Sequence, residues 1–257
     1  MHIIVSQYFH VGPLEIRYYS ITMVLGIIVA YFIGARRARR AGLEKSLFED
    51  MFFWMLVAGF IGARFYYVLF YPQYFQGNWL TALEIWRGGI SIYGGVLGGL
   101  LVLWGFARKI KWQFLKLTDI IAPALPLAQA IGRFGNFFNY EAFGNPTNLP
   151  WKMYVPLQFR PAAYAQYSYF QPTFLYEAIW DVLVFFFVLW LGKKTSRTGV
   201  LTAAYLLFYS IGRYFIEGLR LDSAFFGNFR GDQITAVLLM IAALIIMVRQ
   251  YANRNAK

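Results

Sequence analysis

Long apolar stretches alternate with short basic segments along the whole chain. Seven of these stretches are close to 20 residues long and contain few charges, at residues 18–35, 51–71, 88–107, 119–138, 173–191, 199–219 and 233–248. A helix needs about 20 mainly apolar residues to cross the hydrocarbon core of a bilayer. The pattern therefore predicts an all-α integral membrane protein with seven transmembrane helices. Pro123 and Pro126 interrupt the fourth.

The basic residues between the stretches predict the orientation. Fifteen of the 24 Lys and Arg residues fall on one side if the spans alternate: Arg36, Arg37, Arg39, Arg40, Lys45, Arg108, Lys109, Lys111, Lys116, Lys193, Lys194, Arg197, Arg249, Arg254 and Lys257. Because short cytoplasmic loops are enriched in Lys and Arg, we expect the N-terminus outside and the C-terminus in the cytoplasm. Residues 1–12 lack a basic region and a cleavage pattern, so the first helix is expected to stay as an anchor.

The longest segment between spans, residues 140–172, contains five prolines and many Tyr and Trp side chains. Such rings favour the membrane–water interface. We expect a small external cap between the fourth and fifth helices. Nothing in the pattern resembles a second soluble domain, so residues 1–257 are predicted to form a single polytopic membrane domain.

Composition narrows the function classes. The chain is 59% hydrophobic and only 14% charged, with a net charge of +12, whereas soluble domains carry roughly 25% charged residues. The excess of basic residues raises nucleic acid as a partner, but the apolar runs favour a membrane protein instead. The chain has no Cys and only two His. This excludes a disulfide framework and a thiolate nucleophile, and we expect no metal site.

The third stretch contains two pairs of glycines spaced four residues apart, Gly94 with Gly98 and Gly95 with Gly99. Small residues at this spacing let another backbone approach a membrane helix closely. Tight helix packing is one interpretation, and a groove floor for an acyl chain is the other.

Several ionisable side chains lie within or beside the spans: Arg64, Arg133, Glu141, Glu177, Asp181, Arg213 and Glu217. Each is costly in lipid and is either part of a functional site or of a structural ion pair. Tyr209, Arg213 and Glu217 share a helix face because they are four residues apart. The like-charged neighbours Glu177 and Asp181 need a cation between them, such as Arg64 or Arg213, or a proton on one of them.

The densest polar cluster is Gly132-Arg133-x-Gly135-Asn136-Phe137-x-Asn139-x-Glu141-x-x-Gly144. The planar fork of an arginine suits a phosphate group, and amides add neutral donors. Glycines allow the backbone to approach a ligand. We therefore expect this segment to bind an anionic ligand.

This motif resembles the signature of the bacterial prolipoprotein diacylglyceryl transferases. The similarity also covers the segments 62–71, 88–95 and 171–177, and the spacing of Tyr209, Arg213, Glu217 and Arg220. It implies seven helices and transfer of the diacylglyceryl group of phosphatidylglycerol to the thiol of the lipobox Cys of a preprolipoprotein, with release of glycerol phosphate. The implied partners are phosphatidylglycerol, lipobox signal peptides and the bilayer of the bacterial cell membrane, without a cofactor or nucleic acid.

The resemblance also implies site residues. We expect Arg133 and Arg213 to bind the phosphate and leaving group, and Asn136 and Asn139 to orient the headgroup. The expected catalytic residues are Arg133, Arg213, Tyr19, Glu141, Glu217 and Tyr93, and the expected substrate-binding residues are Arg133, Asn136, Asn139, Gly144, Tyr209 and Arg64.

Two questions stay open at this point. Many relatives have a His where this chain has Tyr93, so the base that takes the thiol proton is Tyr93, Glu141, Glu217 or water. A transporter is the main rival class because buried Arg and Glu also mark ion paths, although we find no inverted repeat. A retinal protein is excluded because it would need a Lys within a span, and the Lys residues of this chain lie in loops. A purely structural scaffold is disfavoured because it would not need the polar cluster.

Overall fold

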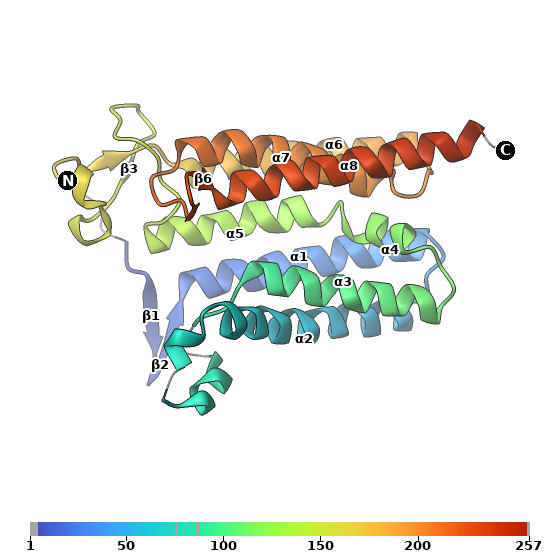
Figure 1. Cartoon of the computed structure of the whole chain (residues 1–257), viewed down its shortest axis with the longest axis horizontal. Helices are drawn as coiled ribbons and strands as arrows, with labels where there is room; N and C mark the ends of the chain where they lie inside the picture. Colours follow the sequence, from blue (N-terminus) through green and yellow to red (C-terminus); the bar gives the residue numbers. More distant parts are fainter. Residues whose placement is uncertain (1–4, 76, 86–87, 256–257) are drawn as a thin grey trace. The chain divides into compact units, whose positions relative to one another are not determined.

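The computed structural model describes residues 5–75, 77–85 and 88–255 (Figure 1). Helices dominate this part of the chain, as the apolar pattern predicts. The α-helices are α1 (Tyr18–Arg40), α2 (Lys45–Phe70), α3 (Ile92–Lys109), α4 (Phe114–Ile121), α5 (Leu125–Asn139), α6 (Thr173–Lys194), α7 (Val200–Leu219) and α8 (Gly231–Asn255). Each of the seven predicted stretches overlaps at least one of them. The fourth is split into α4 and α5 at residues 122–124, because Pro123 interrupts the helix.

The strands in the described residues form three short antiparallel hairpins. They pair β1 (Tyr8–Val11) with β2 (Leu14–Arg17), β3 (Met153–Tyr154) with β4 (Tyr169–Phe170), and β5 (Phe225–Phe226) with β6 (Phe229–Arg230). Short 3-10 turns occupy η1 (Pro72–Phe75), η2 (Trp79–Leu83), η4 (Leu157–Phe159) and η5 (Ala162–Tyr164). Every hairpin and turn lies between or before helices, so the helices provide the framework.

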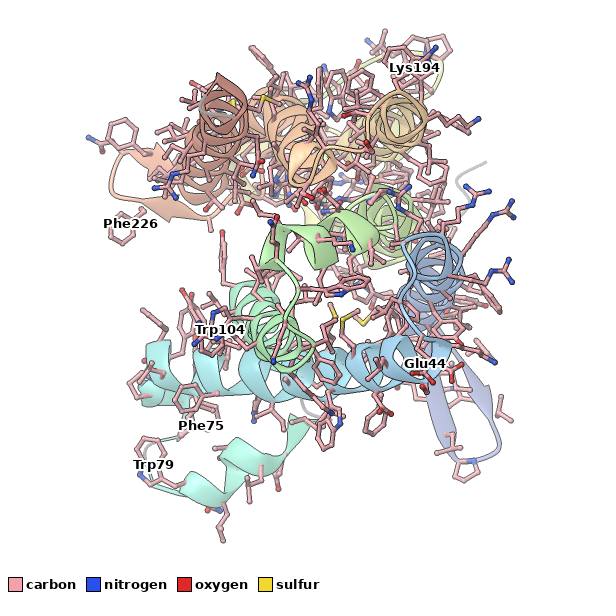
Figure 2. All side chains as sticks on the ribbon, turned by 90° about the vertical axis from the view of Figure 1, so that its right-hand side faces the viewer. Glu44, Phe75, Trp79, Trp104, Lys194 and Phe226 are labelled. Carbon is pink, nitrogen blue, oxygen red and sulfur yellow. The ribbon has the colours of Figure 1, made fainter. Side chains whose placement is uncertain are left out.

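Among the residues that the structure describes, four helices are long and apolar enough to cross a membrane: α1, α2, α6 and α8. The bent pair α4–α5 is a fifth if it is counted as one span. Few residues of these apolar windows are buried: 11% in α1 and 33% in α6. Large exposed side chains such as Trp104 on α3 and Phe226 on β5 are visible in Figure 2. A surface this apolar is that of a membrane protein.

The chain divides into two compact units, Met1–Gly34 with Ile121–Lys257, and Ala35–Ile120. In the second unit α2 and α3 lie side by side (Figure 1). A Cβ atom added at Gly94 would collide with the backbone oxygen of Gly62, and one at Gly98 with that of Ala58. The predicted tight helix packing is therefore confirmed for Gly94 and Gly98.

In the first unit α6 packs against α5 and α7, and α7 packs against α8. A buried apolar cluster joins α6 to α7, formed by Ala122, Val184, Val188, Leu201, Ala204 and Tyr205. This cluster and the packing of α7 against α8 hold these helices together, so that polar residues from different helices can meet.

Residues 140–172 fold around their own apolar cluster. Phe143, Val155 and Phe170 are almost completely buried in it. Gly144 N donates to Gln171 O over 2.8 Å, which joins the two ends of the segment. Residues 140–172, called the cap below, are thus a folded segment of the first unit directly after α5, and their external location stays a prediction.

Candidate active site

Two arginines meet on one carboxylate between α5, α6 and α7. Glu177 of α6 accepts a hydrogen bond from Arg133 Nη2 of α5 through Oε1, and from Arg213 Nη1 of α7 through Oε2 at 2.8 Å. The Glu177 side chain is only 1% exposed. A buried carboxylate is stable only when it is well paired. Glu177 therefore fixes the two arginines beside each other.

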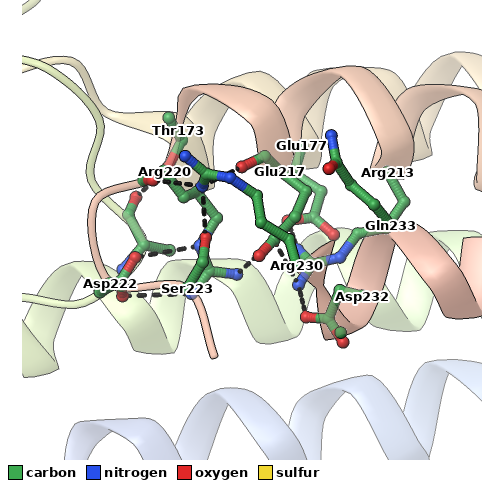
Figure 3. Close-up of polar contacts among 12 residues, drawn as sticks. Thr173, Glu177, Arg213, Glu217, Arg220, Asp222, Ser223, Arg230, Asp232 and Gln233 are labelled. Atoms are coloured by element: carbon green, nitrogen blue, oxygen red, sulfur yellow. Dashed lines mark hydrogen bonds and ion pairs between the residues drawn. The ribbon is translucent and has the colours of Figure 1, made fainter. Parts of the chain in front are cut away.

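Arg213 contacts three carboxylates within the described part of the chain (Figure 3). Its Nη2 lies 3.0 Å from Glu217 Oε2 and also binds Asp232 Oδ2, from the first turn of α8. The pair with Glu217 confirms the i, i+4 spacing seen in the sequence. The contact with Asp232 was not predicted, because Asp232 is 19 residues away and no local spacing links it to Arg213.

Asp181 lies one turn after Glu177 and is fully buried. Its two carboxylate oxygens have no hydrogen-bond partner in the part of the chain that the structure describes. The sequence indicated that a cation, or a proton, must relieve the repulsion between the two carboxylates. Arg213 provides this cation for Glu177, with which it forms an ion pair.

Arg133 retains an unused donor. Its Nε is buried and has no hydrogen-bond partner among the described residues, while Nη2 is held by Glu177. An unsatisfied buried N–H is costly. This donor is therefore available to an anionic ligand.

The signature segment is organised around Glu141. Asn136 Nδ2 donates to Glu141 Oε2 over 3.2 Å, and Asn139 Nδ2 donates to Oε1 over 3.4 Å. Gly135 approaches Tyr19 of α1 so closely that an added Cβ would lie 2.6 Å from its ring. The structure thus places Tyr19 beside the signature helix, and its expected catalytic role stays a prediction.

The loop between α7 and α8 closes one end of the site. Arg220 donates to both oxygens of Asp222, at 3.0 and 3.1 Å, and its Nη1 lies 3.5 Å from Glu217 Oε2. Arg230 Nη1 donates to the carbonyls of Glu217 and Arg220 and to Ser223 Oγ. Figure 3 shows these contacts as one continuous network. Of the residues in this loop network, the spaced sequence motif contains only Glu217 and Arg220.

Asp222 also ties this loop to the start of the cap. Its Oδ2 accepts the N–H of Ala142 at 2.8 Å, and Leu221 N donates to Phe143 O. Ala142 adopts a left-handed conformation with φ of 55°, which needs such support. Burial by itself raises the pKa of the Asp222 carboxyl. The hydrogen bonds and charge of Arg220, with the N–H of Ala142, outweigh it, so this pKa lies below its usual value.

Gly144 stands where the cap meets the end of α7. It forms a β-bridge with Arg220. A Cβ atom at this position would lie 2.8 Å from Leu219 O and 3.0 Å from the Thr173 side chain. These neighbours leave no room for a side chain at Gly144, and its predicted contact with substrate stays a prediction. Tyr209, one turn before Arg213, stacks on Tyr205 with ring centroids 5.7 Å apart.

The remaining expected site residues, Arg64 and Tyr93, belong to the unit Ala35–Ile120. The guanidinium of Arg64 donates to five backbone carbonyls between residues 81 and 89, four of them within 2.8 Å. Tyr93 packs near Tyr66, with 6.0 Å between ring centroids. No group of three His, Asp or Glu side chains is arranged to hold a metal ion in the described residues.

The fold and the site define a helical membrane protein that keeps a paired-arginine network among apolar helices. Residues 6–249 match the family described as "Prolipoprotein diacylglyceryl transferase", and the chain belongs to this family. Curated relatives named phosphatidylglycerol--prolipoprotein diacylglyceryl transferase agree over nearly the whole chain.

The relative from Thermotoga maritima is 46% identical over 93% of this chain and 83% of its own length. Those from Fervidobacterium nodosum and Synechococcus elongatus are 45% and 40% identical, over 93% and 96% of this chain and 82% and 87% of their own lengths. The resemblance seen in the sequence is therefore confirmed.

Proposed function

We propose that this protein transfers the diacylglyceryl group of phosphatidylglycerol to the thiol of the lipobox Cys in preprolipoproteins, the first step of bacterial lipoprotein maturation. Its family and the names of its relatives support this activity. The observation that supports the site is the meeting of Arg133 and Arg213 on Glu177. Two fixed guanidinium groups suit the phosphate of an anionic lipid.

In the proposed reaction the thiol sulfur forms a bond to the glyceryl carbon. The bond from that carbon to the phosphate oxygen breaks, and glycerol phosphate leaves. Negative charge grows on the leaving oxygen, and preorganised donors at this position lower the barrier. Arg133 and Arg213 supply these donors. Asn136 and Asn139 orient the headgroup.

The thiol proton passes to a base, for which Glu141, Glu217, Tyr93 and water are the candidates. Glu217 is held by ion pairs with Arg213 and Arg220, so it already has a structural role. Glu141 accepts hydrogen bonds from neutral amides. This contrast favours Glu141 over Glu217.

The proposal includes the finer topology. α3 and α7, of 18 and 20 residues, would complete seven spans with α1, α2, α4–α5, α6 and α8. Basic residues in the last turns of α1, α3 and α6 support a cytoplasmic location for these helix ends. The N-terminus and the cap at 140–172 would then face outward from the bacterial cell membrane.

The direct test measures the transfer of a labelled diacylglyceryl group from phosphatidylglycerol to a lipobox peptide by the purified protein in lipid. Arg133→Ala should abolish transfer, whereas Arg39→Ala, at the exposed end of α1, should retain it. Near-normal transfer by Arg133→Ala would refute the role of Arg133 in binding phosphate. Ion flux through the wild-type protein without transfer would favour a transporter.

A further inference from the structure

Both arginines proposed to bind the phosphate are already paired with carboxylates. Arg133 pairs with Glu177, and Arg213 pairs with Glu177, Glu217 and Asp232. A lipid phosphodiester brings a further negative charge. An additional unpaired anion in a partly buried site is unfavourable. A phosphate that binds Nη2 of Arg213 must therefore displace a carboxylate from it.

The three carboxylates on Arg213 differ in accessibility. The side chains of Glu177 and Glu217 are each 1% exposed, whereas that of Asp232 is 38% exposed. Glu177 also holds Arg133, and Glu217 also faces Arg220. Displacing either would break two buried ion pairs. Asp232 is the carboxylate that solvent, and hence a ligand, can reach.

From this geometry we propose that Asp232 is a displaceable carboxylate, which competes with the substrate phosphate for Nη2 of Arg213. Carboxylate and phosphate oxygens bind guanidinium N–H groups in the same way. The proposal rests on the proposed function and adds a specificity-determining residue to it. Asp232 stands in the first turn of α8. The partial positive charge of a helix N-terminus stabilises a carboxylate there after it leaves Arg213.

The test is the steady-state kinetics of the full-length protein in mixed micelles, with phosphatidylglycerol as the varied substrate. Asp232→Asn keeps the shape of the side chain but removes the competing charge. We expect the KM for phosphatidylglycerol to fall about three- to tenfold, with a smaller change in kcat. A change in structure alone would not improve KM selectively.

Asp222→Asn is the matched control, because it removes the same charge from the neighbouring loop, at Arg220. Its KM should not fall. An unchanged or raised KM in Asp232→Asn would overturn the inference, and so would an equal fall in both variants, which would indicate a general effect of charge. If Asp232→Asn does not fold, Asp232→Ser gives the same comparison. Failure of the wild type to transfer at all would instead refute the proposed function.

Discussion

Two buried arginines of this protein have opposite surroundings. Arg213 is held by three carboxylates that come from α6, α7 and α8. Arg64 is held by backbone carbonyls of the segment between α2 and α3. Both residues are no more than 9% exposed, and both lie in apolar helices. A buried arginine is therefore not by itself evidence of a substrate site.

The difference lies in what a ligand could replace. A phosphate can take the place of a carboxylate on Arg213, because both are anions. The carbonyls around Arg64 are neutral main-chain groups that need this guanidinium to satisfy them. This geometry favours a structural role for Arg64, although it was expected to bind substrate. Four variants test the comparison.

The largest effect is expected for Arg213→Lys. Lysine keeps the charge but lacks the planar guanidinium, whose several N–H donors can bind Glu177, Glu217 and a phosphate at the same time. We expect transfer to fall roughly 10²- to 10³-fold, measured with the lipobox-peptide assay. Arg39→Lys is the control at an exposed position. Retention of more than a tenth of the activity would place the phosphate elsewhere.

Arg64→Met should act on stability more than on binding. The substitution leaves several carbonyls unsatisfied, which should lower the free energy of unfolding by about 2–4 kcal/mol. Thermal unfolding in detergent measures the loss. The KM of the folded fraction for phosphatidylglycerol should stay close to that of the wild type. A raised KM with normal stability would restore the expected role of Arg64 in substrate binding.

Tyr93→Phe should lower turnover without abolishing it. The Tyr93 side chain is partly exposed, and loss of one hydroxyl hydrogen bond corresponds to about a fivefold decrease. The measurement is kcat as a function of pH. Complete loss together with a shifted pH profile would instead identify the Tyr93 hydroxyl as the group that takes the proton.

The smallest effect is expected for Asp222→Asn on stability. The folded-state pKa of Asp222 lies below its usual value. Its stabilising effect is therefore complete above the unfolded-state pKa of about 3.9 and is lost as the pH falls through the folded-state pKa. The difference in Tm between wild type and Asp222→Asn should be constant from about pH 6 to 8 and shrink below about pH 4. A constant difference down to about pH 2 would contradict the ion pair.

Local spacing accounts for the features that sequence reasoning predicted. Helix α7 places Arg213 and Glu217 on one face whatever surrounds it, because four residues make about one turn. Pro123 interrupts the fourth stretch through its missing N–H. These properties depend only on neighbouring residues.

The partners of the buried charges depend on the tertiary structure. Arg133 meets Glu177 across 44 positions, and Asp222 meets the N–H of Ala142 across 80. No periodicity connects such residues, since helix packing and loop closure set the distances between them. The sequence by itself determined that apolar helices with costly internal charges would form, and its signature indicated the family. Only the packing of α5 to α8 decided which charges neutralise one another, because an ion pair forms between atoms that meet in space.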